Sequence, residues 1–203
     1  EENNKEIKQW KRIEVLKDYR FYIICMTMLA MPWIATGSFV YQSFISSSKE
    51  WGPYVIAQSF MAYSILSVIT LFLSGFLIDK FSSRKLLIYM NIPLFFSTVV
   101  LYYFNAPLSS FVFFGLLGVT NGLANVLGSS TWAEIYGVKF IGSIKALTTA
   151  LMVFATAFGT ALFGFLIDIG FSIEQIAFVS GTYIFGSIIL LYLVKNKLNP
   201  QYL

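Results

Sequence analysis

The strongest constraint on this chain is the length of its uncharged apolar stretches. Asp, Glu, Lys and Arg are absent from residues 21–48, 51–78, 86–133, 146–167 and 175–194. An apolar run of about 18 residues or more is long enough to cross the hydrocarbon core of a bilayer as a helix. The third run has room for two helices, and the turn-forming residues Asn105-Ala106-Pro107 divide it.

The sequence therefore predicts an all-α membrane protein with six transmembrane helices. The expected spans are residues 21–46, 54–78, 86–104, 109–131, 146–167 and 175–194. A spanning backbone must satisfy its own hydrogen bonds, which leaves helices or a closed β-barrel. Barrel strands are alternating segments of about ten residues, and these runs are too long and too uniformly apolar for that.

The basic residues predict the orientation of the six spans. Of the 14 Lys and Arg, six precede the first span, three follow the second, two follow the fourth and two follow the sixth, which leaves only Lys49 on the other side. The positive-inside rule then places both termini in the cytoplasm of a plasma membrane, the inner membrane in bacteria. The net charge of +4 is explained by topology, so no nucleic-acid partner is expected.

These signals also divide the chain into domains. Residues 1–20 are expected to form a cytoplasmic amphipathic helix, because Trp10, Ile13 and Leu16 have helical spacing. Residues 21–195 are the six-helix transmembrane domain, and residues 196–203 are a cytoplasmic tail.

One five-residue phrase, GFLID, occurs twice, at Gly75–Asp79 and at Gly164–Asp168. Each copy ends the second helix of a three-helix set, and the two copies are expected at opposite faces of the membrane. Basic residues follow only the first copy. This arrangement indicates an inverted three-plus-three repeat, which is common among secondary transporters.

The residues after the first copy carry a resemblance to a known family. Gly75–Lys85 resembles the loop pattern of the major facilitator superfamily, with Gly75, Leu77, Asp79, Lys80 and Arg84 in matching positions. Ser82 stands where the family usually has Gly, and Ser83 where it usually has a basic residue.

The resemblance extends over essentially the whole chain. Four stretches are similar to the loop between helices ten and eleven, and to helix eleven, of bacterial members: Trp132–Gly137, Gly142–Lys145, Ala157–Thr160 and Gly164–Asp168. Val15–Phe21 is similar to the central cytoplasmic loop. It implies the C-terminal half, helices seven to twelve, of a twelve-helix carrier of bacterial type. We therefore expect a fragment whose N-terminal six-helix half belongs to the same polypeptide or to a partner subunit.

The resemblance also implies a function and a latch. Members carry a small solute across the bilayer by alternating access, and the matching loop holds one conformation. The latch residues are then Gly75, Asp79, Lys80, Arg84 and Lys85. Chemically, Gly75 would let two helix ends approach, and Asp79 would cap the next helix or pair with Arg84 or Lys85.

Polar residues near the middle of the spans are candidates for a substrate cavity. They are Thr36, Tyr41, Gln42, Gln58, Tyr63, Asn121, Asn125, Thr149 and Thr156. The alternatives are that the Asn side chains bond between helices and that the Thr hydroxyls bond their own backbone. Candidates for helix packing or gating are Pro32, Gly37, Gly118, Gly122, Gly159 and Gly164. Pro32 and Gly37 are expected to weaken the middle of the first span.

What the sequence lacks restricts the other function classes. The chain has no His and only one Cys, Cys25, so no Ser–His enzyme, metal centre or bound cofactor is expected. No acid or base lies in the middle of a span, so a titrating group for proton coupling would belong to the other half. Lys145 is expected to extend to the membrane interface rather than to bind an anion. A stand-alone six-helix scaffold or accessory protein remains an alternative, as does an aquaporin-like channel, although the channel's Asn-Pro-Ala phrases are absent.

Overall fold

A computed structural model describes residues 7–202 of this chain, and helices make up nearly all of that part. Within these residues, six helical segments are long and apolar enough to cross a membrane: Tyr19–Val40, Pro53–Phe81, Ser83–Tyr103, Pro107–Tyr136, Ile141–Asp168 and Ile173–Lys197. Each corresponds to one predicted span. The chain is an integral membrane protein.

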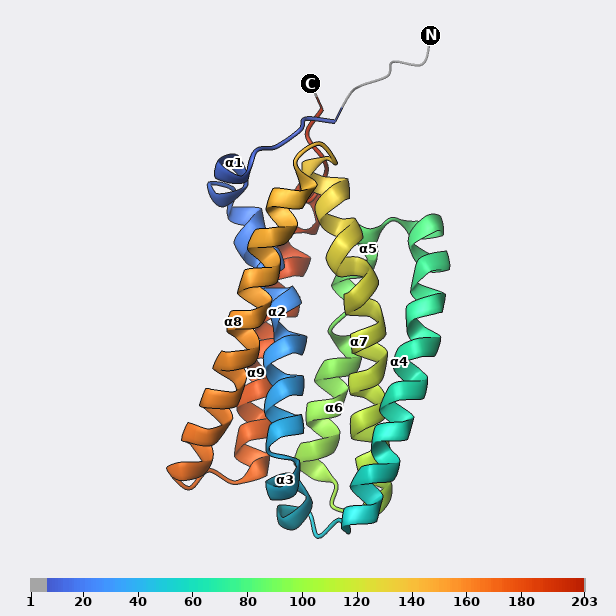
Figure 1. Cartoon of the computed structure of the whole chain (residues 1–203), viewed down its shortest axis with the longest axis vertical. Helices are drawn as coiled ribbons and strands as arrows, with labels where there is room; N and C mark the ends of the chain where they lie inside the picture. The colour runs from blue at the N-terminus through green and yellow to red at the C-terminus, as the bar shows by residue number, and fades with distance from the viewer. Residues whose placement is uncertain (1–6, 203) are drawn as a thin grey trace.

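The helices form one elongated bundle (Figure 1). In chain order they are α1 (Arg12–Leu16), α2 (Tyr19–Val40), α3 (Gln42–Ser48), α4 (Pro53–Phe81), α5 (Ser83–Leu86), the 3-10 helix η1 (Leu87–Tyr89), α6 (Ile92–Tyr103), α7 (Pro107–Tyr136), α8 (Ile141–Asp168), α9 (Ile173–Val194) and the 3-10 helix η2 (Lys195–Lys197). Helix α2 packs on α8 and α9, α4 packs on α7, and α6 packs between α7 and α9.

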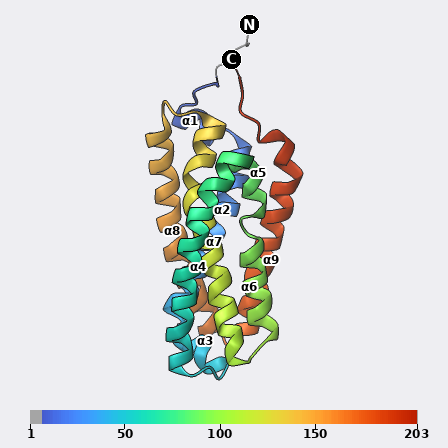
Figure 2. The ribbon, with the colours of Figure 1, turned by 90° about the vertical axis from the view of Figure 1, so that its right-hand side faces the viewer.

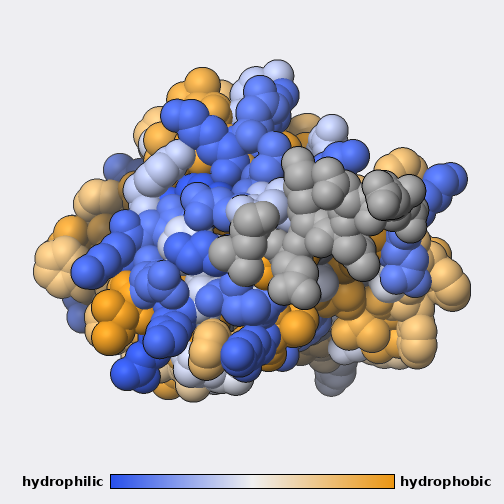
Figure 3. Space-filling model, turned by 90° about the horizontal axis from the view of Figure 1, so that it is seen from above, coloured by the Kyte–Doolittle hydropathy of each residue, from blue (hydrophilic) through white to orange (hydrophobic). Residues whose placement is uncertain are grey.

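The two ends of the bundle differ. At the end where residues 7–18 and 195–202 meet, called here the basic end, lie also the α4–α5 and α7–α8 connections (Figure 2). Hydrophilic side chains gather on this end, with apolar side chains around them (Figure 3). Helix α3 and the α6–α7 and α8–α9 connections form the opposite end.

Local sequence signals explain where several helices begin. Pro53 and Pro107 lie in the first turns of α4 and α7, where a missing N–H costs nothing. Asp18 caps α2 by accepting a hydrogen bond from the Arg20 N–H at 2.9 Å. Ser172 and Gln175 form a reciprocal capping box at the start of α9.

The expected amphipathic helix over residues 1–20 is wrong in its extent. Residues 1–6 lie outside the described part of the chain, and α1 covers only Arg12–Leu16. Trp10 precedes α1 and is buried against Tyr136, with ring centroids 5.4 Å apart, whereas Ile13 is 67% exposed. The two side chains therefore do not share one apolar face. The indole of Trp10 packs into the basic end instead.

The first and third spans also differ from expectation. Helix α2 continues through Pro32 and Gly37 to Val40, and the chain bends only at Tyr41, so its middle is not broken. The third span is interrupted between η1 and α6, around the buried Asn91. Pro93 accounts for the break, because it has no N–H to continue the helical hydrogen bonds.

Five of the six residues proposed for packing or gating are glycines at helix contacts. A Cβ on Gly122 would lie 2.6 Å from the Ser67 carbonyl oxygen of α4, and one on Gly118 would meet the Tyr63 carbonyl. On the other side of the bundle, Gly37 faces the Phe163 ring, Gly159 faces the Trp33 carbonyl, and Gly164 faces the Tyr41 hydroxyl. Gly118, Gly122 and Gly159 let the α4–α7 and α2–α8 pairs approach backbone to backbone, and Gly37 and Gly164 make room for aromatic side chains.

Candidate functional site

A cavity of about 400 Å³ lies between α2, α7 and α8, with Tyr63 contributed by α4. Three helical stripes line it. On α2 the stripe includes Cys25, Met28, Pro32, Thr36 and Phe39; on α7 it includes Asn121, Asn125, Ser129 and Trp132; on α8 it includes Lys145, Thr149, Met152 and Thr156. Steps of three and four residues keep each set on one helix face. The volume is in the range of small-molecule sites.

Six of the nine cavity candidates line this space: Thr36, Tyr63, Asn121, Asn125, Thr149 and Thr156. Three lie elsewhere. Tyr41 follows the end of α2 and stacks on Phe163, with ring centroids 6.4 Å apart. Gln42 lies on α3 at the opposite end, and Gln58 is exposed on α4. Their polarity alone could not show which way their helices face.

The polar residues of the cavity also form hydrogen bonds to the protein, and one of these bonds joins two helices. The amide of Asn121 donates to the Ser67 hydroxyl at 2.8 Å and so joins α7 to α4. Asn125 donates to the Asn121 carbonyl of its own helix at 2.9 Å, and the Thr156 hydroxyl donates to the Val153 carbonyl. Both roles considered for Asn121 therefore coexist, because its side chain bonds between helices while facing the cavity.

Sequence reasoning missed several residues that line the cavity, among them Cys25, Met28, Ser129, Trp132 and Lys145. Helical spacing could have found two of them. Asn121 and Asn125 continue in steps of four and three to Ser129 and Trp132.

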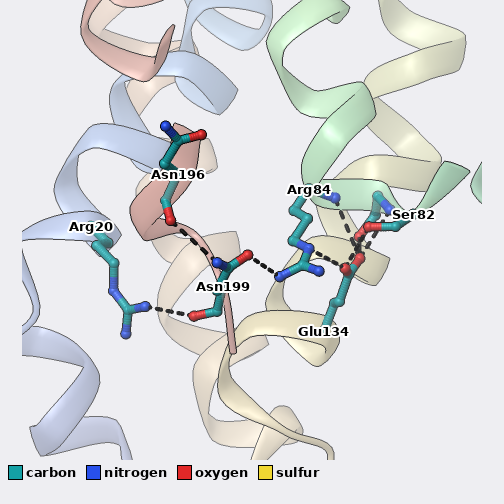
Figure 4. A network of polar contacts seen from close by, with 7 residues as sticks. Arg20, Ser82, Arg84, Glu134, Asn196 and Asn199 are labelled. Carbon is teal, nitrogen blue, oxygen red and sulfur yellow. Dashed lines mark hydrogen bonds and ion pairs between the residues drawn. The ribbon is translucent and has the colours of Figure 1, made fainter. Parts of the chain in front are cut away.

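A second polar site joins the α4–α5 connection to the end of α7. Glu134 of α7 accepts hydrogen bonds from the Ser83 N–H at 2.9 Å and from the hydroxyls of Ser82 and Ser83. The Arg84 guanidinium forms an ion pair with the same carboxylate at 2.9 Å (Figure 4). Glu134 thus caps the start of α5 from a neighbouring helix, where a carboxylate is favoured by the free N–H groups.

The ion-pair partner predicted for Arg84 is therefore wrong. Arg84 pairs with Glu134 rather than with Asp79, and within residues 7–202 the Asp79 side chain has no hydrogen bond or ion pair. Asp79, Lys80 and Lys85 are exposed. Gly75 has open space where a Cβ would stand, so it does not bring two helix ends together. Sequence distance explains the error, because Glu134 is 50 residues from Arg84.

Ser82 occupies a backbone conformation that favours glycine. Its φ is +74°, a region that few residues with a side chain adopt. The family pattern has Gly at this position, and the local geometry gives the physical reason. Ser82 is held there by its hydrogen bond to Glu134.

The Arg84 site extends to both terminal segments through Asn199. Arg84 Nη1 donates to Asn199 Oδ1 at 2.7 Å, and Arg20 Nη1 donates to the Asn199 carbonyl at 3.0 Å (Figure 4). Arg20 is itself buried and paired with Asp18 at 2.7 Å. The connection between α4 and α5, the start of α2 and the C-terminal segment are therefore one polar network.

The opposite end carries a buried lysine. The Lys49 side chain is fully buried, its ammonium lies 2.7 Å from Glu174 Oε1, and it donates to Asn105 Oδ1 at 2.8 Å. The Trp51 indole N–H donates to the Asn105 carbonyl at 2.9 Å. Lys49, in the α3–α4 connection, thus contacts both the α6–α7 connection and the first turn of α9.

Within residues 7–202, no group of three or more His, Cys, Asp or Glu side chains could hold a metal ion. The described sites are thus a cavity with polar stripes and two polar networks at the ends of the bundle.

Comparison with known proteins gives one family. A family model described as Major Facilitator Superfamily matches residues 22–201. No protein of curated function shows significant similarity to the chain.

Proposed function

Because the chain belongs to the Major Facilitator Superfamily, a family of membrane transporters, we propose that it is the C-terminal six-helix half of a carrier that moves a small solute by alternating access. The cavity between α2, α7 and α8 is the observation that carries this proposal. The N-terminal half, in the same polypeptide or in a partner subunit, would form its other wall. The basic end would face the cytoplasm, as the positive-inside rule predicts.

Helix packing supports the inverted repeat that such a mechanism uses. Gly122 of α7 packs against Thr70 of α4, and Gly159 of α8 packs against Trp33 of α2. Positions 33 and 122 are 89 apart, as are positions 70 and 159, and so are the two GFLID copies at 75 and 164. The same helix crossing is therefore made twice. The α4–α7 pair crosses the bundle in the direction opposite to that of the α2–α8 pair. Two equivalent triplets can rock about one site.

The Glu134 site fits a latch that must form and open. Its contacts join α4, α5 and α7 at the basic end, and the Arg84 and Glu134 side chains are each about a quarter exposed. A partly exposed ion pair with several hydrogen bonds contributes only a few kcal/mol, which biases an equilibrium between two conformations without locking it. We propose Glu134, Ser83 and Arg84 as the latch, in place of Asp79.

Two-sided labelling of the cavity tests alternating access. Ser129→Cys would be the only thiol, with every other cysteine replaced by Ser, in the native polypeptide reconstituted into liposomes. We expect a membrane-impermeant thiol reagent to label it from either side. Lys139→Cys, in the α7–α8 connection outside the cavity, is the matched control and should be labelled from one side only.

Glu134→Gln in the same background should change the ratio of Ser129→Cys labelling from the two sides, because the latch at the basic end keeps its shape but loses its charge pair. Labelling from one side alone, whatever the state of the latch, would contradict alternating access.

The intact mass of the native polypeptide tests whether this chain is one half of a longer carrier. A mass near twice the 22.9 kDa of this chain supports a single polypeptide with both halves.

A further inference from the structure

One charged side chain lies in the cavity. Among the described residues that line it, Lys145 alone carries a charge. It begins the α8 stripe that continues through Thr149, Met152 and Thr156, in steps of four, three and four residues. Lys145 is therefore directed toward the cavity by the same helix geometry that directs the polar residues below it.

Comparison with Lys139 indicates that Lys145 is more than a positive-inside signal for membrane topology. Both lysines lie near the basic end, but Lys139 is in the α7–α8 connection, does not line the cavity and lies over the Phe140 ring. Lys145 is exposed, and within residues 7–202 its ammonium has no ion pair and no hydrogen bond. A lysine serving only to orient the helix needs no place on the cavity face.

We propose that Lys145 is the anion-binding group of the cavity and that the transported solute is an organic monoanion, a carboxylate with a largely apolar body. This rests on the proposed carrier function. One ammonium balances one negative charge, and it binds as a point charge without the bidentate geometry that arginine would impose. Asn121 and Asn125 lie deeper on α7, where their amides can meet a second polar group of the solute.

The rest of the wall supports an apolar body. Met28, Leu29, Met31, Phe39, Leu151 and Met152 line the same cavity. Methionine side chains adapt to ligands of different shape, and an apolar wall gains from removing an apolar ligand surface from water. A small, strongly hydrated inorganic anion would gain nothing from this wall. The pattern of one cation, a few amides and hydroxyls and a thioether-rich wall fits an amphipathic anion.

The first test measures the field of Lys145 without any substrate. The thiol of Ser129→Cys, in the background without other cysteines, is treated from the basic-end side with 2-sulfonatoethyl methanethiosulfonate and with its trimethylammonium analogue. We expect the anionic reagent to be favoured, and Lys145→Gln to lower the anion-to-cation rate ratio about tenfold, because a charged cleft concentrates the opposite charge. Lys139→Gln, the control, should leave the ratio within about twofold. A ratio that Lys145→Gln leaves unchanged overturns the proposal.

The second test asks for binding. Phenylacetate and 4-methylpentanoate, each with its neutral amide and its ammonium analogue, are added at about 10 mM, above the usual range of carrier and enzyme half-saturation. We expect at least one carboxylate to slow alkylation of the introduced thiol by a neutral maleimide. Its amide and ammonium analogues should slow the alkylation less. Lys145→Gln should remove the protection. Lys145→Arg should keep part of it.

The remaining outcomes decide against the proposal. Protection by no carboxylate, or equal protection by the amides, overturns it. An anionic phospholipid could pair with the Lys145 ammonium instead. In that case the anion-to-cation rate ratio falls in phosphatidylglycerol liposomes and is restored in neutral ones. This outcome also overturns the proposal. Neither test depends on two-sided access, so one-sided labelling would refute the carrier mechanism while leaving the charge preference measurable.

Discussion

Removing the partner of the buried Lys49 should destabilise the protein more than removing both charges. In Glu174→Ala the ammonium keeps Asn105 Oδ1 at 2.8 Å but loses the carboxylate at 2.7 Å. Breaking a buried ion pair on one side costs about 3–5 kcal/mol. The Glu174 side chain is 37% exposed, so water can partly replace it, and we expect the lower limit, about 3 kcal/mol.

The double variant Lys49→Met/Glu174→Ala has no stranded charge. Met is close to Lys in volume, and the exposed Asn105 can bond to water, so stability should return to within about 1 kcal/mol of the wild type. The assay is thermal unfolding in mild detergent, where 3 kcal/mol corresponds to roughly 6–12 °C for a domain of this size. Glu174→Gln, which keeps an acceptor, should fall between. If the double variant is as unstable as the sum of its single variants, the two side chains do not act as a pair and the reasoning is refuted.

Three other expectations follow from described contacts. Gly159→Leu should separate α8 from the Trp33 carbonyl and lower stability by about 1–3 kcal/mol in detergent unfolding, whereas Gly75→Leu, which has open space, should change it by less than about 0.5 kcal/mol. Ser82→Gly should be nearly neutral, because relief of the positive φ offsets a lost hydrogen bond, while Ser82→Ala should cost about 1–2 kcal/mol; equal effects would contradict the strain argument. Asn199→Ala should speed proteolytic cleavage of residues 196–202, and an unchanged cleavage rate would show that the arginines do not hold this segment.

The six spans could be predicted because membrane helices are specified by composition along the chain. Their ends could not be placed as well, since charge alone set the predicted limits. Helix α7 continues past residue 131 to Tyr136 because Glu134 has partners on α5, and α8 begins at Ile141, four residues before Lys145, rather than at residue 146. A charged residue can lie inside a helix when something satisfies it, and that information is not local.

For the candidate site, too, local spacing could be read from the sequence, whereas contacts between distant residues could not. Steps of three and four residues were enough to group Asn121 with Asn125, and the cavity contains both. The pairing of Arg84 with Glu134 was missed because no sequence pattern connects residues 50 positions apart. Tyr41, Gln42 and Gln58 were misplaced because an apolar helix in lipid shows no polar face that would give its rotation.

The pairing of α2 with α8 has a consequence for how the protein is made. Helix α2 ends at Val40 and its partner begins at Ile141, so about 100 residues must be synthesised before the two can meet, roughly 5–20 s at ribosomal rates. During that time Trp33 and Gly37 of α2, which pack on Gly159 and Phe163 in the finished bundle, have no packed neighbour on the α8 side. The interval between the synthesis of α4 and that of its partner α7 is much shorter. The newly inserted α2 is therefore the segment most exposed to membrane chaperones and proteases before the bundle closes.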